Sequence, residues 1–166
     1  MYTSHFNLAD DLVSHLDGVL SEVTDPFLLS RYAGFVAVSA ATVFELAVKS
    51  ILIDFAAAQH PVLSNFVGRV FERLNGRVSL QALKEEHLPK FGAAYVAKFS
   101  SKLEETELAI LRSEGESVKS SYGNLLQWRH GFAHGGLLPA TATYAEVCRS
   151  YHSGKHVLHS LAFTMT

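Results

Sequence analysis

Residues 32–58 read YAGFVAVSAATVFELAVKSILIDFAAA, which is the longest apolar stretch of the chain. Its apolar residues do not keep to one side of a helix, and a helix that is apolar nearly all round belongs at the centre of a helical bundle. Asp25 and Pro26 precede it as a helix N-cap followed by proline at the first helical position. His60 stands before a proline, where helices usually end. The pattern predicts one long central helix over residues 26–59.

The same stretch is long enough to span a bilayer, but Glu45, Lys49 and Asp54 interrupt it. We therefore expect a buried helix and no membrane association. The first residues, MYTSHF, show no basic run followed by an apolar run, so no secretory signal is expected. Cys148 is the only cysteine, which excludes an internal disulfide and suits a reducing, cytoplasmic location.

Periodic apolar positions and turn residues predict further helices on both sides of the central one, and no strands. Asn75 and Gly76 are expected to end a third helix, and Ser79 to begin a short fourth segment. The predicted helices cover residues 6–23, 62–74, 79–87, 90–112, 117–134 and 143–163. With 166 residues and 48% hydrophobic content, the chain is expected to form a single domain over residues 1–166. The expected fold is all-α, an up-and-down bundle of about five helices.

The helix expected over residues 117–134 ends in WRHGFAHGG, residues 128–136. Here an apolar pattern suddenly carries Arg129, His130 and His134, and then stops at a pair of glycines. An arginine is a fixed positive fork for phosphate, and a histidine carries a proton near neutral pH. These two side chains suit phosphodiester chemistry that needs no metal. At the helix C-terminus, where positive charge is favoured, His134 is the expected general acid and base.

Arg129 and His134 are five residues apart, so their directions on a helix differ by about 140°. One straight helix cannot aim both side chains at a common phosphate. Two copies of the helix that face each other across a two-fold axis can, because each contributes its arginine and histidine to one cleft. The spacing favours a homodimer with a composite site, although a long arginine that curls round within one chain is the other geometry.

Arg129 has apolar helical neighbours, and a charge in that setting needs a partner. The partner is expected to be either a phosphate or the carboxylate of Glu45 in the central helix. Glu45 also has a simpler alternative, an ion pair with Lys49 four residues later. Asn124, Gln127 and His130 are expected to orient His134 or to bind phosphate oxygens.

The histidines allow a metal-binding alternative. His130 and His134 are four residues apart, as are His152 and His156, and His159 follows three residues later. This spacing occurs in metal sites on helices. No HExxH motif, second cysteine or rich set of nearby carboxylates accompanies it. We therefore expect no metal and no cofactor, and assign the last three histidines to an exposed or interface face of the last helix.

The net charge of −2 at pH 7 argues against a protein that coats nucleic acid by bulk electrostatics. Any RNA contact must come from a local patch.

Judged by residue type alone, Arg129 and His134 have an equally simple structural explanation. Arg129 would then be an ion-paired arginine, and His134 an ordinary histidine at a helix end.

The segment RHGFAH, residues 129–134, resembles the signature of the HEPN superfamily (higher eukaryotes and prokaryotes nucleotide-binding domains). That signature is an arginine followed four to six residues later by a histidine, often with a polar residue directly after the arginine. The preceding SSYGNLLQW, the FEL at residues 44–46 and the closing helix from Thr143 resemble the prokaryotic RiboL-PSP-like branch. The helical order extends the resemblance over most of the chain, while only the Arg-to-His segment is specific to it.

The resemblance implies a dimeric helical bundle that cleaves RNA without a metal. By the same resemblance, Arg129 holds the scissile phosphate, His134 assists attack by the ribose 2′-hydroxyl, and His130 is a polar auxiliary. Glu45 would orient Arg129. The implied products are a 2′,3′-cyclic phosphate and a 5′-hydroxyl. Gly131 departs from the pattern and is expected to loosen the helix at the site.

Prokaryotic members of this superfamily often serve as toxins or as abortive-infection effectors against phage. The resemblance therefore implies a cognate antitoxin or an associated defence protein as a partner, beside the RNA substrate. Other members have lost catalysis. The alternative function is thus a non-catalytic module that binds a nucleotide, an RNA or a protein partner.

Overall fold

The computed structural model of the chain describes residues 1–72, 74 and 76–166. In this part of the chain every regular element is a helix. The α-helices are α1 (Asn7–Leu20), α2 (Pro26–Gln59), α3 (Pro61–Phe71), α4 (Leu80–Ala82), α5 (Ala93–Glu114), α6 (Val118–Gly135) and α7 (Tyr144–Thr164). Two 3-10 turns, η1 (Tyr2–Phe6) and η3 (Leu88–Phe91), and one π-helical turn, η2 (Leu83–His87), complete the set. The all-α prediction is confirmed: the described residues hold seven α-helices, one in each predicted range, where a bundle of about five was expected.

The long helix α2 begins and ends where the sequence predicts. The Asp25 carboxylate accepts a hydrogen bond from the Phe27 backbone N–H at 2.9 Å, and His60 ends the helix in an extended conformation. α2 packs against α1, α3, α6 and α7. By length and composition alone α2 could also span a membrane, and 56% of its most apolar window is buried within the protein. The helix is therefore the centre of the core.

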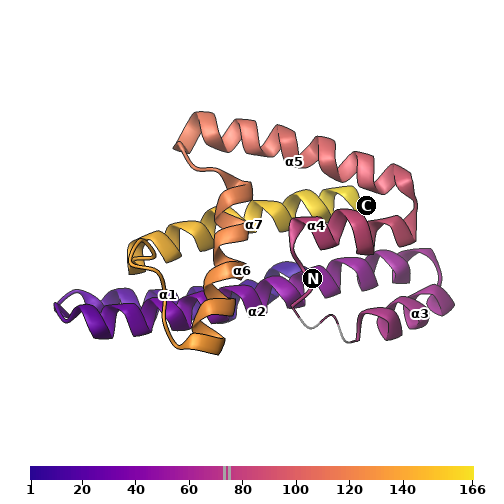
Figure 1. Cartoon of the computed structure of the whole chain (residues 1–166). Helices are drawn as coiled ribbons and strands as arrows, with labels where there is room; N and C mark the ends of the chain where they lie inside the picture. The colour runs from indigo at the N-terminus through magenta and orange to yellow at the C-terminus, as the bar shows by residue number, and fades with distance from the viewer. Residues whose placement is uncertain (73, 75) are drawn as a thin grey trace.

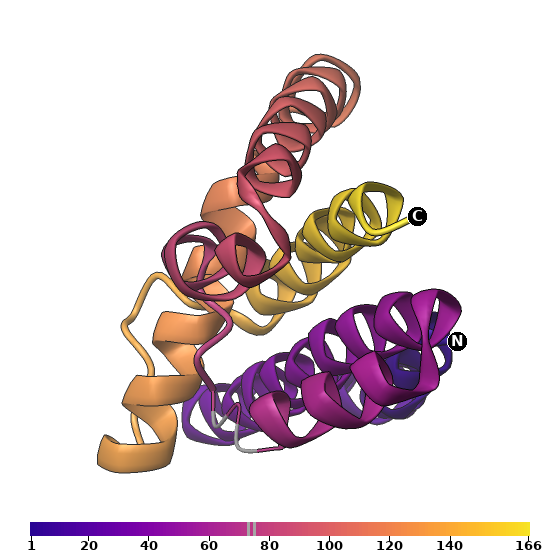
Figure 2. The same cartoon turned by 90° about the vertical axis from the view of Figure 1, so that its right-hand side faces the viewer.

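The helices form layers, with α6 lying across them (Figure 1). α1, α2 and α3 make the lowest layer of that view, α7 and α4 lie above it, and α5 lies on top. Figure 2, the view from the side, shows the same three levels with α6 along one edge. Since α6 contacts α2, α7 and α5, it joins the layers and holds the predicted site at its lower end.

Three stacked aromatic rings fix the crossing of α2, α6 and α7. Phe44 of α2 lies 5.2 Å from the Tyr122 ring of α6 and 5.9 Å from the Tyr151 ring of α7, between ring centroids. Gly154 of α7 gives the room, because a Cβ there would lie 3.0 Å from the Phe44 ring. All three rings are fully buried. Such a cluster specifies the position of α6 because buried aromatic pairs prefer defined geometries.

Some helix ends differ from the prediction. The first α-helix ends at Leu20, short of residue 23, and its first turn is the 3-10 turn η1. α5 begins at Ala93 and not at residue 90, because Gly92 has a φ of 118°, which interrupts the helix. α3 ends at Phe71, and the predicted stop at Asn75 lies outside the described residues.

Candidate active site

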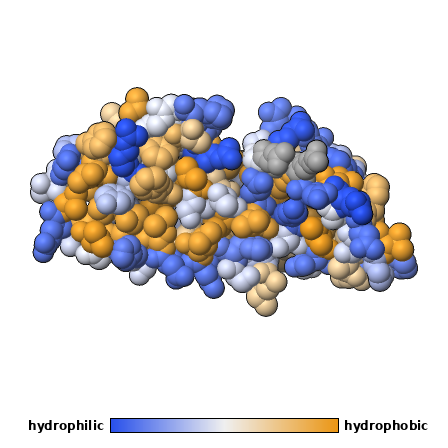
Figure 3. Space-filling view, turned by 90° about the horizontal axis from the view of Figure 1, so that it is seen from below, coloured by the Kyte–Doolittle hydropathy of each residue, from blue (hydrophilic) through white to orange (hydrophobic). Residues whose placement is uncertain are grey.

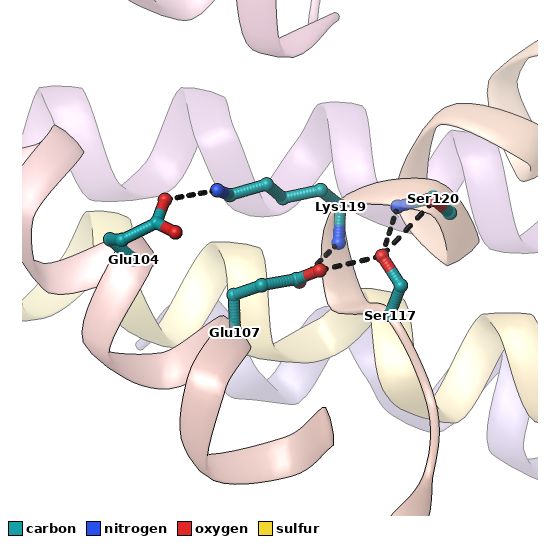
Figure 4. Close-up of polar contacts among 5 residues, drawn as sticks. All are labelled: Glu104, Glu107, Ser117, Lys119 and Ser120. Carbon is teal, nitrogen blue, oxygen red and sulfur yellow. Dashed lines mark hydrogen bonds and ion pairs between the residues drawn. The ribbon is translucent and has the colours of Figure 1, made fainter. Parts of the chain in front are cut away.

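The N-terminal end of α6 is held by side chains from α6 and α5 (Figure 4). Ser117 caps the helix by accepting a hydrogen bond from the Ser120 backbone N–H at 3.2 Å, as its position predicts. The Glu107 carboxylate of α5 accepts from the Ser117 hydroxyl at 2.6 Å and from the Lys119 backbone N–H at 2.9 Å. Lys119 also forms an ion pair with Glu104. Four polar side chains thus fix the helix at the end far from the predicted site.

The C-terminal half of α6 is held against α2 by an aromatic contact. The Phe132 ring lies directly over Gly34, where a Cβ atom would come within 2.2 Å of it, and it makes an edge contact with Phe35 at 5.7 Å between centroids. Helix α6 ends at Gly135, and Gly136 caps it with a φ of 66° and an N–H that donates to the Phe132 carbonyl at 2.8 Å. This is an αL helix end, which glycine adopts without strain.

Arg129 points from α6 to a turn that follows α3. Its guanidinium lies against Gly76, where a Cβ atom would be 3.3 Å from Nη1. Gly76 has a φ of 77°, a left-handed conformation that favours glycine. Beside this contact is a small cavity of about 30 Å³, lined by Ala41, Glu45, Gly76, Val78, Leu126 and Arg129. The arginine is therefore half-buried and lodged against backbone.

Glu45 lines the same cavity, and its carboxylate is hydrogen-bonded to the turn that contains Gly76. Its Oε2 accepts a hydrogen bond from the Gly76 N–H at 2.8 Å. Within the described parts of the chain, Arg129 has no ion pair with a carboxylate, Glu45 included. The alternative pair with Lys49 is also not formed, because Lys49 donates to the Glu72 carbonyl at 3.2 Å. Glu45 and Arg129 are thus brought together as the sequence suggests, through Gly76 and not by direct contact.

His130 and His134 lie on the exposed side of α6. Their ring centroids are 4.5 Å apart with a tilt of 54°, as expected for residues one turn apart. Both side chains are exposed, and no hydrogen bond holds either ring among the residues the structure describes. The two imidazoles therefore face solvent, on a flank of α6 different from the one that carries Arg129.

The two predicted supporting residues of α6 are placed differently. Gln127 is exposed and, at seven residues before His134, shares its face of the helix. Asn124 is half-buried and lies about 80° from His134 around the helix axis. Gln127 is thus the better placed of the two to act beside the histidines.

Arg31 of α2 is a residue that the sequence analysis missed. Its guanidinium donates to the Gly136 carbonyl at the end of α6 and stacks on the Phe27 ring, 4.8 Å from its centroid. The signal was present, because an arginine within a strongly apolar helix needs a partner. Arg31 places a positive charge at the C-terminal end of α6, where the helix dipole favours it.

The histidines of α7 form no site with those of α6. His159 is hydrogen-bonded to the Tyr2 hydroxyl at 2.7 Å, and the His156 ring lies 6.0 Å from it. His152 and His159 are exposed, as expected, and His156 is half-buried. Among the described residues, no three His, Cys, Asp or Glu side chains lie where they could together hold a metal ion.

Comparison with known sequences identifies the family. A sequence model of the RiboL-PSP-HEPN family matches residues 4–162, which is nearly the whole chain. Searches of curated proteins and of solved structures gave no significant match. The match covers α1 to α6 in full and α7 up to residue 162, and it includes the segment from Arg129 to His134. The chain therefore belongs to the RiboL-PSP-HEPN family, within the HEPN superfamily.

Proposed function

We propose that the protein is a metal-independent endoribonuclease whose active site is completed by a second copy of the chain. The observation that carries this proposal is the arrangement on α6. A guanidinium without a carboxylate partner in the described structure lies on one flank, and a pair of exposed imidazoles lies on the other. Membership of a family that generally includes ribonucleases supports the same reaction.

In the proposed reaction, Arg129 binds the non-bridging oxygens of the scissile phosphate through its planar fork. His134 removes the proton of the ribose 2′-hydroxyl as its oxygen attacks phosphorus. The bond from phosphorus to the 5′-oxygen breaks, and His134 returns the proton to that oxygen. The products are a 2′,3′-cyclic phosphate and a 5′-hydroxyl. His130 and Gln127 contact phosphate oxygens beside His134, and Glu45 helps to orient Arg129.

The second copy is needed because Arg129 and His134 leave α6 in directions about 140° apart. A hydrophobic surface beside the site offers a place for it. Large apolar side chains are exposed there at Leu28, Phe35 and Leu137, by 41%, 52% and 68%. Figure 3 shows hydrophobic residues gathered over the face on which α1, α2 and α3 lie. Exposed apolar patches of this kind mark interaction sites.

The RNA-cleavage assay tests the reaction directly. Wild type, Arg129→Ala and His134→Ala are compared on single-stranded RNA in EDTA, with His156→Ala on α7 as a matched control. We expect cleavage in EDTA by wild type and the control, and a loss of about 10²- to 10⁴-fold in the other two. Full cleavage by both site variants would refute the proposal. Activity lost on chelation would indicate a metal enzyme.

The dimer is tested by Phe35→Glu, with Leu111→Glu on α5 as a control of similar exposure. Buried charge without a partner is costly, so Phe35→Glu should give a monomer in analytical ultracentrifugation and lose cleavage. The control should remain dimeric and active. A monomeric wild type that cleaves RNA would overturn the composite site.

The biological setting follows from the same reaction. We propose a cytoplasmic toxin or phage-defence effector, restrained by a cognate antitoxin or an associated defence protein. Growth arrest on expression that His134→Ala abolishes would support this role. A stable complex with RNA or protein, without any cleavage, would instead favour the non-catalytic binding module.

A further inference from the structure

The turn of residues 76–78, against which Arg129 lies, is held at every residue by a side chain from elsewhere. The Gly76 N–H donates to Glu45 of α2 at 2.8 Å. His87 of η2 donates from Nε2 to the Arg77 carbonyl at 2.6 Å. The hydroxyl of Tyr122, on α6, donates to the Val78 carbonyl at 2.7 Å. Three elements thus converge on three consecutive residues.

Of these three bonds, the one from Tyr122 to Val78 is buried, and the other two are part-buried. Tyr122 and Val78 are fully buried, and His87 is 5% exposed. Hydrogen bonds shielded from water hold their geometry more strictly than exposed ones, because neither partner can exchange to solvent. The turn is therefore fixed by bonds that are wholly or partly shielded from water, although it belongs to no helix.

Only one of the two ring nitrogens of His87 forms a hydrogen bond to the turn of residues 76–78. A carbonyl only accepts, so Nε2 carries a proton, and in the neutral ring Nδ1 then has none. Nδ1 is buried and has no hydrogen-bond partner among the described residues. Burial also lowers the pKa of His87, which favours this neutral form. Its bond to the Arg77 carbonyl is thus the one polar contact that this buried ring makes in the described chain.

Arg129 meets the turn at its most constrained residue. Gly76 combines a φ of 77° with a contact so close that a Cβ atom would lie 3.3 Å from Nη1 and 3.7 Å from Nη2 of Arg129. Both terminal nitrogens therefore rest near the Gly76 Cα. Any movement of the turn would change where the guanidinium fork points, and phosphate recognition by arginine depends on that direction.

We infer that the turn of residues 76–78 positions Arg129 for phosphate binding, and that Glu45, His87 and Tyr122 are positioning residues that act through it. This inference rests on the proposed function for its catalytic consequence. It assigns to Glu45 an action on the Gly76 backbone in place of an ion pair with Arg129.

The first experiment measures kcat and KM for RNA cleavage in two pairs of variants. Glu45→Ala removes the acceptor of the Gly76 N–H, whereas Glu45→Gln keeps an oxygen in its place. Tyr122→Phe removes the donor to Val78. Its control is Tyr151→Phe, which removes a buried hydroxyl bonded to the Phe6 carbonyl, away from the turn. We expect kcat/KM to fall roughly tenfold in Glu45→Ala and Tyr122→Phe, and to stay within about twofold in Glu45→Gln and Tyr151→Phe.

A double-mutant cycle separates positioning from general destabilisation. If Tyr122 acts through Arg129, Tyr122→Phe should have no further effect on cleavage in an Arg129→Ala background. An equal loss in both backgrounds, or an equal loss in Tyr151→Phe, would overturn the inference. So would a Glu45→Gln variant as slow as Glu45→Ala.

A second measurement tests the position of Arg129 independently of RNA cleavage. If the wild type cleaves no RNA, the proposed function is refuted, but the positioning of Arg129 can still be tested. The NMR signal of the Arg129 Nε–H group reports the setting of the guanidinium. It should shift and broaden in Tyr122→Phe and remain unchanged in Tyr151→Phe. An unchanged signal in Tyr122→Phe would refute the positioning role.

Discussion

On one flank of α6, Arg129 lies half-buried against the turn of residues 76–78, within contact distance of Gly76. On the other flank, His130 and His134 contact each other and otherwise face solvent. Residues of one helix, at most five positions apart, therefore differ in how far the fold fixes them. In the proposed site, a single chain would thus fix the phosphate-binding half and leave the proton-transfer half open, and the proposed second chain would complete that half.

The largest effect is expected when the two inactive variants Arg129→Ala and His134→Ala are mixed, which tests whether the two flanks of α6 act in a site shared by two chains. Dimers that join Arg129→Ala with His134→Ala retain one arginine and one histidine, from different chains. If each site uses the arginine of one protomer and the histidine of its partner, random mixing should restore roughly a quarter of wild-type cleavage. The measurement is the initial rate after the two proteins are unfolded and refolded together. A mixture as inactive as its components would show that each site lies within one chain.

The N-terminal anchor of α6 should matter for stability and not for the site. Glu107→Ala removes the acceptor of two hydrogen bonds, to Ser117 and to the Lys119 backbone. We expect the free energy of unfolding to fall by about 1–2 kcal/mol. Glu104→Ala, which breaks only a surface ion pair with Lys119, should cost less than about 1 kcal/mol. Urea denaturation measures both, and equal losses would contradict the assigned role of Glu107.

Glycine to alanine substitutions at two helical positions should change the free energy of unfolding in opposite directions. At Gly18 nothing lies within 4 Å of the added Cβ, so Gly18→Ala should raise the free energy of unfolding by about 0.5–1 kcal/mol. At Gly34 the Cβ would collide with the Phe132 ring, and the cost of overpacking should outweigh the helical gain, for a net loss of about 1 kcal/mol. Denaturation curves test the signs. A stabilised Gly34→Ala would mean that Phe132 does not hold the C-terminal half of α6 tightly.

The smallest expected effect is a pH dependence at the turn under Arg129. Burial lowers the pKa of His87, with positive Lys90 and Arg77 adding to the effect and Glu86 and the bond to the Arg77 carbonyl opposing it. The unfolded chain then binds a proton more readily than the folded one. His87 should contribute stability that is present above about pH 6.5 and is lost as the pH falls toward its folded pKa.

His152 and His159 also have lowered pKa values, so wild type must be compared with His87→Gln. We expect the unfolding free energy of wild type to fall more steeply between pH 7.5 and 5.5 than that of the variant. Parallel curves would show that His87 does not contribute.

The sequence by itself determined the helical class, the bounds of α2 and four helix caps, because these depend on residues close together in the chain. Each cap, at the first residue of a predicted helix or directly before it, accepts a backbone hydrogen bond: Asp25, Ser79, Ser117 and Thr143. The resemblance of residues 129–134 also led to the HEPN family, which the family match confirms. The roles of Arg129, His130 and His134 stay predictions.

Only the tertiary structure decided what surrounds those residues. Tyr122 reaches Val78 across 44 positions of sequence, and Gly76 reaches Glu45 across 31. From the sequence alone, Gly76 is a helix stop, Glu45 is a candidate partner of Arg129, and His87 has no predicted role. Helical periodicity and capping extend over a few residues, whereas the choice of which turn meets which helix is made by packing the whole core. The physical setting of Arg129 could therefore not be inferred from its own segment.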